Sequence, residues 1–105
     1  MMRLVFICHP YAGDIEKHER CVRDIAINIA ADRKRVPMAP QIYLPQIYDE
    51  ATDRAHALDV CEDLLWRCDE IRVYGEPSPG MRREIGAAMR RGMRIVRITH
   101  TCGDA

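Results

Sequence analysis

The sequence predicts a small three-layer α/β domain with a mainly parallel four-stranded sheet, in the spatial order 2-1-3-4, and helices on both faces. Short apolar runs of strand length alternate with longer segments in which apolar residues recur every three or four positions. Because strands separated by helices cannot pair as hairpins, we expect a parallel sheet with right-handed crossovers. The chain has 105 residues, enough for a single core, so we predict one domain over residues 1–105.

The two most apolar strands are expected at the centre of the sheet. Residues 4–8 (Leu-Val-Phe-Ile-Cys) form an unbroken apolar run, which is typical of a strand covered on both faces. Residues 70–74 are predicted as the third strand. The second strand, 36–39, contains a proline that lacks an amide donor, and the fourth, 94–99, contains two arginines, so both suit the edges.

Each predicted helix has a start signal. Asp14 is a good N-cap for the first helix, and the second is expected to begin near Thr52 or Asp53. Ser78 can cap the third helix, with a proline at the first helical position, and Gly92 suits its end.

The segment 40–46 between the second strand and the second helix contains two prolines, and we predict an extended conformation for it. Several large side chains near it lie outside the predicted core stripes. We therefore predict a homo-oligomer that associates through Tyr43, Leu44, Ile47, Tyr48 and Trp66.

Charge and composition exclude several classes of function. The 16 basic and 16 acidic residues balance, which gives no reason to expect a nucleic acid polymer or an anionic membrane as a partner. No apolar run reaches the roughly 18 residues of a membrane span, and the first residues do not form a signal peptide, so we expect a cytoplasmic protein. The 4 histidines and 5 cysteines lack the spacing of metal ligands, and we expect neither a metal nor another cofactor. The glycine signatures of dinucleotide-binding folds and NTPases are absent.

The strand order predicts where a ligand binds. Open α/β sheets bind ligands beyond the carboxyl ends of their strands at the point where the order reverses, here between the first and third strands. The loops expected there cover residues 8–14 and 75–84. From these loops we predict the ligand-binding residues Cys8, His9, Pro10, Tyr11, Gly13, Gly75, Ser78, Gly80 and Met81.

The second of these loops leads into a helix N-terminus, whose free amides and dipole favour an anion. Gly80 would let a ligand approach the backbone, and Ser78 can donate a hydroxyl. Glu84 lies in the second turn, beside the apolar stripe, so that its carboxylate either faces the crevice or simply complements the helix dipole. His9 is likewise either a proton carrier or a residue that ends a strand.

Four short motifs carry a family resemblance: Phe-Ile-Cys at 6–8, Pro-Tyr-Ala-Gly at 10–13, Arg-Cys-Asp-Glu at 67–70, and Ser-Pro-Gly-Met-Arg-Arg-Glu-Ile at 78–85. Together they resemble the nucleoside 2-deoxyribosyltransferase superfamily. The segment 39–46 makes the whole chain more similar to a small bacterial and phage branch of that superfamily. The resemblance covers nearly the full length, and the start of the third helix is its most specific part.

The resemblance implies a flavodoxin-like sheet and an enzyme that cleaves the N-glycosidic bond of a deoxynucleoside or its monophosphate, as a hydrolase or a deoxyribosyltransferase. By this resemblance Glu84 is the catalytic nucleophile, which attacks the anomeric carbon and forms a covalent glycosyl-enzyme. Ser78 and Gly80 would contact the sugar or its phosphate, and the loop after the first strand would form a wall of the pocket.

The chain departs from the superfamily pattern at two positions. Where superfamily enzymes carry a tyrosine that steadies the glutamate, this chain has Phe6. Where they carry an acid that helps the leaving base, eight residues before Asp69, this chain has Cys61. The nearby residues that could take over these roles are Tyr11, His9, Asp59 and Asp49. The departures favour an alternative function, a non-catalytic module that binds a nucleotide or a similar phosphorylated metabolite.

Overall fold

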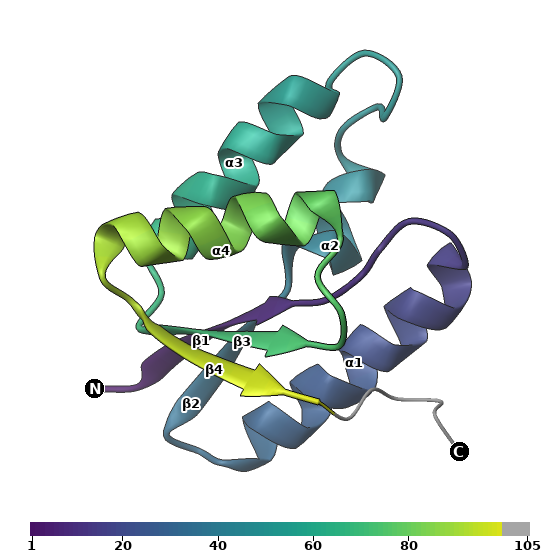
Figure 1. Ribbon diagram of the computed structural model, residues 1–105. Coiled ribbons are helices and arrows are strands. Elements are labelled where there is room, and N and C mark those ends of the chain that lie inside the picture. The colour runs from purple at the N-terminus through teal and green to yellow at the C-terminus, as the bar shows by residue number, and fades with distance from the viewer. Residues whose placement is uncertain (100–105) are drawn as a thin grey trace.

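Four parallel strands form one sheet in the spatial order 2-1-3-4 in the computed structural model, which describes residues 1–99. The strands are β1 (Arg3–Cys8), β2 (Arg35–Met38), β3 (Glu70–Tyr74) and β4 (Arg94–Ile98). Helices α3 (Arg54–Trp66) and α4 (Pro79–Arg91) cover one face of the sheet, and α1 (Ile15–Ala31) covers the other (Figure 1). The predicted fold class and strand order are confirmed.

The two central strands supply side chains to both halves of the core, because consecutive residues of a strand point to opposite faces. The half beneath α3 and α4 contains Phe6, Cys8, Ile71, Val73, Met81 and Ile85. The half beneath α1 contains Val5, Ile7, Val22, Ile29 and Tyr74. Burial on both faces explains why the unbroken apolar run of β1 lies at the centre of the sheet.

The residues predicted to cap the helices do so in the structure. The Asp14 carboxylate accepts a hydrogen bond from the backbone N–H of Lys17 at 3.2 Å, at the start of α1. The Ser78 hydroxyl accepts one from the backbone N–H of Met81 at 3.3 Å, at the start of α4. Gly92 ends α4 with a left-handed φ of 74°, which glycine adopts without strain. Within residues 1–99, none of the helices combines the length and apolarity that a membrane crossing requires.

The segment 40–46 is helical, and the predicted extended conformation is wrong. It forms the short helix α2 (Pro40–Tyr43) and the 3-10 turn η1 (Leu44–Gln46). Each begins with a proline within its first two positions, where the missing amide costs no helical hydrogen bond. A proline breaks a helix when it lies in the interior, but these two prolines lie at the starts of helical turns.

The large apolar side chains around this segment divide into two groups. Leu44 is only 8 % exposed and belongs to the buried residues, so its assignment to an associating surface is wrong. Tyr43, Ile47 and Trp66 are exposed, and Tyr48 is half-buried with its ring against His56. Association through these four residues stays a prediction.

Candidate active site

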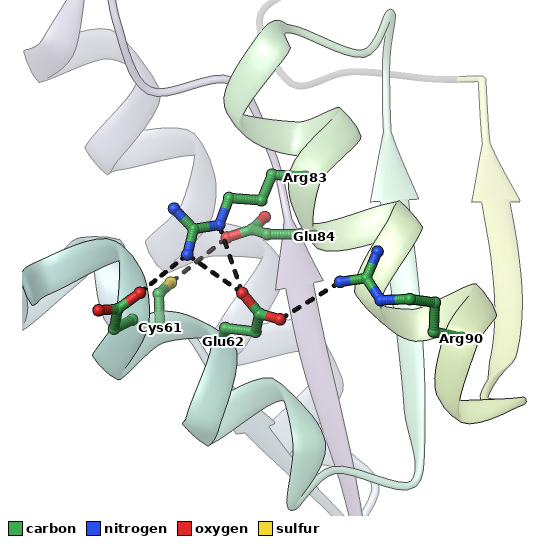
Figure 2. A network of polar contacts seen from close by, with 6 residues as sticks. Cys61, Glu62, Arg83, Glu84 and Arg90 are labelled. Carbon is green, nitrogen blue, oxygen red and sulfur yellow. Dashed lines mark hydrogen bonds and ion pairs between the residues drawn. The ribbon is translucent and has the colours of Figure 1, made fainter. Parts of the chain in front are cut away.

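Glu84 lies on the side of α4 that faces α3. The apolar stripe of α4 fixes this orientation, because Met81 and Ile85 are buried against the sheet and Glu84 lies beside them. The carboxylate is half-buried, and the Cys61 thiol of α3 donates a hydrogen bond to its Oε2 at 3.3 Å. Figure 2 shows the two side chains pointing toward one another across the space between the helices.

Burial raises the pKa of the Glu84 carboxyl above its ordinary value of 4.5, because the charged form loses its water. The Cys8 and Cys61 thiols and the positive charge of Arg83 act in the opposite direction and offset part of this effect. The thiols respond in turn: burial first, and then the Glu84 charge, raise the pKa of both Cys8 and Cys61. Both sulfurs therefore keep their protons at neutral pH, and the Cys61 thiol donates to the carboxylate.

Cys8 joins the end of β1 to the first turn of α4. Its side chain is fully buried, and its Sγ lies 3.9 Å from the backbone oxygen of Met81. The Met81 sulfur in turn accepts a hydrogen bond from the Ser78 N–H at 3.4 Å. Three of the predicted ligand-binding residues thus gather around the same end of α4 as Glu84. Within residues 1–99, no three His, Cys, Asp or Glu side chains are placed to hold a metal ion.

A network of ion pairs joins α3 to α4 beside Glu84 (Figure 2). Arg83 Nη2 lies 3.0 Å from Asp59 Oδ1 and 3.2 Å from Glu62 Oε2. Arg90 Nη2 lies 3.4 Å from Glu62 Oε1, two turns of α4 further along the same seam. Asp59, one of the residues expected near Glu84 as a substitute acid, is 72 % exposed and engaged by Arg83.

His9 follows Cys8 in the chain and belongs to the α1 side of the sheet. Its ring contacts the rings of His18 and Tyr74, with centroids 5.4 Å and 6.3 Å away. Nδ1 lies 2.8 Å from the Pro10 carbonyl oxygen, so the proton of the neutral ring belongs on Nδ1. Nε2 is buried and has no hydrogen-bond partner among residues 1–99. Burial lowers the pKa of His9, which leaves Nε2 as a free acceptor.

The remaining predicted residues form the rim at the carboxyl ends of β1 and β3. Gly13 and Gly75 have positive φ angles of 92° and 73°. Gly75 turns the chain directly after β3, and Gly13 lies in the loop just before α1. Gly80 is exposed, and a Cβ built on it would meet no atom within 4 Å. Pro10 and Tyr11 are half-buried in the loop after β1. The residues are thus grouped as the strand order suggests, and their binding of a ligand stays a prediction.

A groove of about 370 Å³ opens on the other face of the sheet, between α1 and the β3–β4 half. Its lining is Asp24, Ile25, Asn28, Ile29, Arg72, Tyr74 and Ile98. The Arg72 guanidinium in this lining is already paired with the buried Glu70 carboxylate at 3.0 Å. Because Glu84 and its thiols belong to the α4 side, this groove lies apart from the candidate active site.

Two features of the site have only weak signals in the sequence. Asp59 and Glu62 form an acidic pair on one helix, and Arg83 and Arg90 form a basic pair on another. Their complementary charges are visible in the sequence, but their meeting depends on how α3 packs against α4. The contact of His9 with His18 and Tyr74 has no local signal, since it joins three separate elements.

A family model described as a domain of unknown function, DUF7768, matches residues 3–98. The chain belongs to the DUF7768 family. The matched region includes all four strands, Glu84, Cys8 and Cys61. No curated protein matches the sequence. Membership of the bacterial and phage branch named above stays a prediction.

Solved structures share the fold of this DUF7768 chain. A 2-desoxiribosyltransferase from Leishmania mexicana aligns with a TM-score of 0.73 and 18% identity, over 92% of this chain and 64% of that one. A 2-deoxyribosyltransferase from Bacillus psychrosaccharolyticus gives 0.68 and 14%, over 97% and 76%. A conserved protein from Enterococcus faecalis V583 gives 0.67 and 15%, over 92% and 63%. At these identities the likeness shows the fold, and this chain spans less than two thirds of the first and third structures.

Proposed function

We propose that this DUF7768 protein cleaves the N-glycosidic bond of a nucleoside or nucleoside monophosphate, as a hydrolase or a deoxyribosyltransferase, with Glu84 as the nucleophile. The observation that carries the proposal is the Glu84 carboxylate itself, which is half-buried, faces α3 and accepts a hydrogen bond from Cys61. The fold shared with two 2-deoxyribosyltransferases supports it. So does the position of the strand-order reversal, where such sheets bind their ligands.

The proposed reaction has two displacements at the anomeric carbon. First, a Glu84 oxygen bonds to that carbon while the carbon–nitrogen bond breaks, and the released electron pair leaves on the base nitrogen, which takes up a proton from solvent. Water or a second base then attacks the same carbon, loses a proton and releases the carboxylate. Water gives hydrolysis, and a base gives transfer. Positive charge develops on the sugar in both transition states, and a carboxylate beneath it stabilises that charge.

We assign the sugar or its phosphate to the N-terminus of α4. This helix has 13 residues, so its first amides carry a substantial dipole toward an anion. Ser78 supplies a hydroxyl there, and the open space above Gly80 leaves the backbone accessible. In this arrangement the buried Cys8 and Met81 pack beneath the site beside Glu84, and the loop from Pro10 to Gly13 forms the opposite wall.

A panel of ribonucleosides, 2′-deoxynucleosides and their 5′-monophosphates tests the proposal, with free base measured by chromatography. Wild type is expected to release base from at least one member. Glu84→Gln keeps the shape of the side chain but removes the nucleophile, so its rate is expected to fall by about a thousandfold or more. Glu16→Gln, on the exposed first turn of α1, is the matched control and should keep the wild-type rate. Equal rates in wild type and Glu84→Gln, or no base from any member, would contradict the proposal.

One observation favours binding without cleavage as a second candidate. The Cys61 donor and the Cys8 thiol both have a raised pKa, so neither Cys8 nor Cys61 readily gives a proton to a leaving base. A thermal-shift screen of the same panel separates the two functions, since a ligand at one hundred times its Kd stabilises the fold by about 2.7 kcal/mol. Stabilisation by a compound from which no base is released would favour the binding module.

A further inference from the structure

Two cysteines seven residues apart, one in α3 and one after its end, have different roles in the structure. Cys68, just after the helix, is 1 % exposed, and its thiol donates to the backbone oxygen of Leu64 at 3.4 Å, within the same segment. Cys61 is half-buried, and its thiol instead reaches across to Glu84 Oε2 at 3.3 Å (Figure 2). Cys68 thus behaves as an ordinary core cysteine, whereas Cys61 makes a contact between helices.

The direction of this hydrogen bond is fixed by chemistry. A carboxylate only accepts, and the Cys61 sulfur keeps its proton because burial and the Glu84 charge raise the pKa of the thiol. A half-buried carboxylate needs such donors, since an unpaired charge away from water is costly. The geometry gives Glu84 this donor from α3, while the Cys8 thiol of β1 points to the Met81 carbonyl oxygen at 3.9 Å. A donor on a neighbouring helix restricts the rotation of the carboxylate.

The packing of α3 against α4 keeps the contact in register. Arg83 precedes Glu84 in α4 and pairs with Glu62, which follows Cys61 in α3. The Glu62 carboxylate also pairs with Arg90, so that the seam between the helices is held over two turns of α4. The Cys61 sulfur is therefore held opposite Glu84 by contacts on the solvent side of the same seam.

We propose that Cys61 is a positioning residue for Glu84, whose thiol holds the carboxylate in the orientation needed for attack on the sugar. The catalytic consequence rests on the proposed function, in which Glu84 is the nucleophile. A nucleophile held in one orientation loses less entropy on reaching the transition state than a freely rotating one. Cys61 touches neither substrate nor reacting atoms in this scheme and acts through Glu84.

The direct test is a carbon-13 NMR titration of the Glu84 carboxyl in the full chain, with the resonance assigned by its loss in Glu84→Gln. Cys61→Ala is expected to raise the pKa of Glu84, because a donor to the charged form is lost. Cys61→Ser places a stronger donor at the same position and is expected to bring the pKa to the wild-type value or below. Cys68→Ala is the matched control and should leave it unchanged.

The outcomes of this titration are decisive in both directions. The order serine, cysteine, alanine, from lowest to highest pKa of Glu84, supports the proposal. An unchanged or lowered pKa in Cys61→Ala overturns it, and so does an equal rise in Cys68→Ala. If Cys61→Ala fails to fold, Cys61→Ser decides alone, since a pKa above that of wild type would contradict a donor at this position.

Kinetics then separate this inference from the proposed function. With a substrate from the panel, Cys61→Ala is expected to lower kcat by about tenfold, the usual size for a lost hydrogen bond to a charged group, with little change in KM. The acid limb of its pH–rate profile should shift to higher pH, because the pKa of Glu84 is raised. Cys61→Ser should recover most of the rate. A wild type without turnover refutes the proposed function while the titration still decides the positioning role. Turnover with an unchanged kcat and an unmoved titration in Cys61→Ala refutes only the positioning role.

Discussion

Arg83 of α4 pairs with Glu62 of α3 at 3.2 Å, directly beside the contact between their chain neighbours Glu84 and Cys61. The two contacts are consecutive steps of one helix–helix seam, and they differ in their exposure to water. Arg83 is 40 % exposed, so its ion pair is solvated and contributes little to stability. Glu84 has lost enough water for its pKa to rise, so its charge costs stability. The seam thus combines a weak ion pair at its surface, the Arg83–Glu62 clamp, with an internal Glu84 carboxylate whose charge costs stability.

The clamp predicts a small, salt-dependent contribution to stability. Glu62→Gln removes the charge that both Arg83 and Arg90 contact, and we expect the free energy of unfolding to fall by about 0.5–1 kcal/mol at low ionic strength. In about 1 M salt the loss should nearly vanish, because the Debye length there is only about 3 Å. Urea unfolding at the two salt concentrations measures both values. Glu50→Gln, which removes one exposed pair with Arg54, is the control and should cost less; a loss that salt leaves unchanged would contradict an electrostatic clamp.

Removal of the Glu84 charge is expected to increase the free energy of unfolding at neutral pH. Since burial raises the folded-state pKa above 4.5, the folded protein binds the proton more tightly than the unfolded chain does. The contribution of Glu84 to stability is therefore lost as pH rises from about 4.5 through the folded-state pKa. Glu84→Gln should be more stable than wild type at neutral pH, and equally stable below pH 4.5. Denaturant unfolding across this range tests it, and a variant less stable than wild type at pH 7 would show that the charge is fully compensated.

Local signals in the sequence were enough to predict the sheet and the helix ends. The apolar run of β1, the Asp14 and Ser78 caps and Gly92 each act through neighbouring residues, and the structure uses all of them. The segment 40–46 was not predictable in this way, because a proline both breaks a helix and begins one. Long-range contacts decided it: the Gln41 side chain donates to the Ile7 carbonyl oxygen at 3.1 Å, and Leu44 is buried.

In the candidate site, too, local features could be predicted from the sequence and long-range contacts could not. The orientation of Glu84 follows from its place beside Met81 and Ile85 within one helix, so helical spacing could predict it. The Cys61 contact could not be predicted, because it depends on the distance between two helices. The separation of His9 from Glu84 also follows only from the three-dimensional arrangement: the His9 ring contacts His18 of α1 and Tyr74, whereas Glu84 lies in α4 and faces α3.

The coupling between Cys61 and Glu84 predicts a change in thiol reactivity. Glu84 raises the pKa of the Cys61 thiol, so Glu84→Gln should lower it and increase the thiolate fraction at a fixed, mildly alkaline pH. Alkylation of Cys61 by iodoacetamide, followed by mass spectrometry of peptides, should then be severalfold faster than in wild type. Cys68, whose pKa is raised to about 11 by burial and Asp69, reports on opening of the fold and should keep its rate. An unchanged Cys61 rate would mean that the carboxylate and the thiol are not coupled in solution.

His9 predicts a pH effect of the opposite sign to that of Glu84. Burial lowers its pKa below the ordinary 6.5, so the unfolded chain takes up the proton first as the solution is acidified, and stability is lost as pH falls below 6.5. Nitrogen-15 NMR of the ring should show a neutral histidine at pH 7 with its proton on Nδ1, as the 2.8 Å contact with the Pro10 oxygen requires. His9→Phe assigns the resonance and, lacking an ionisable ring, should lose less stability between pH 7 and 5 than wild type. A proton on Nε2, or titration above 6.5, would show that the buried nitrogen is paired in solution and is not a free acceptor for a ligand.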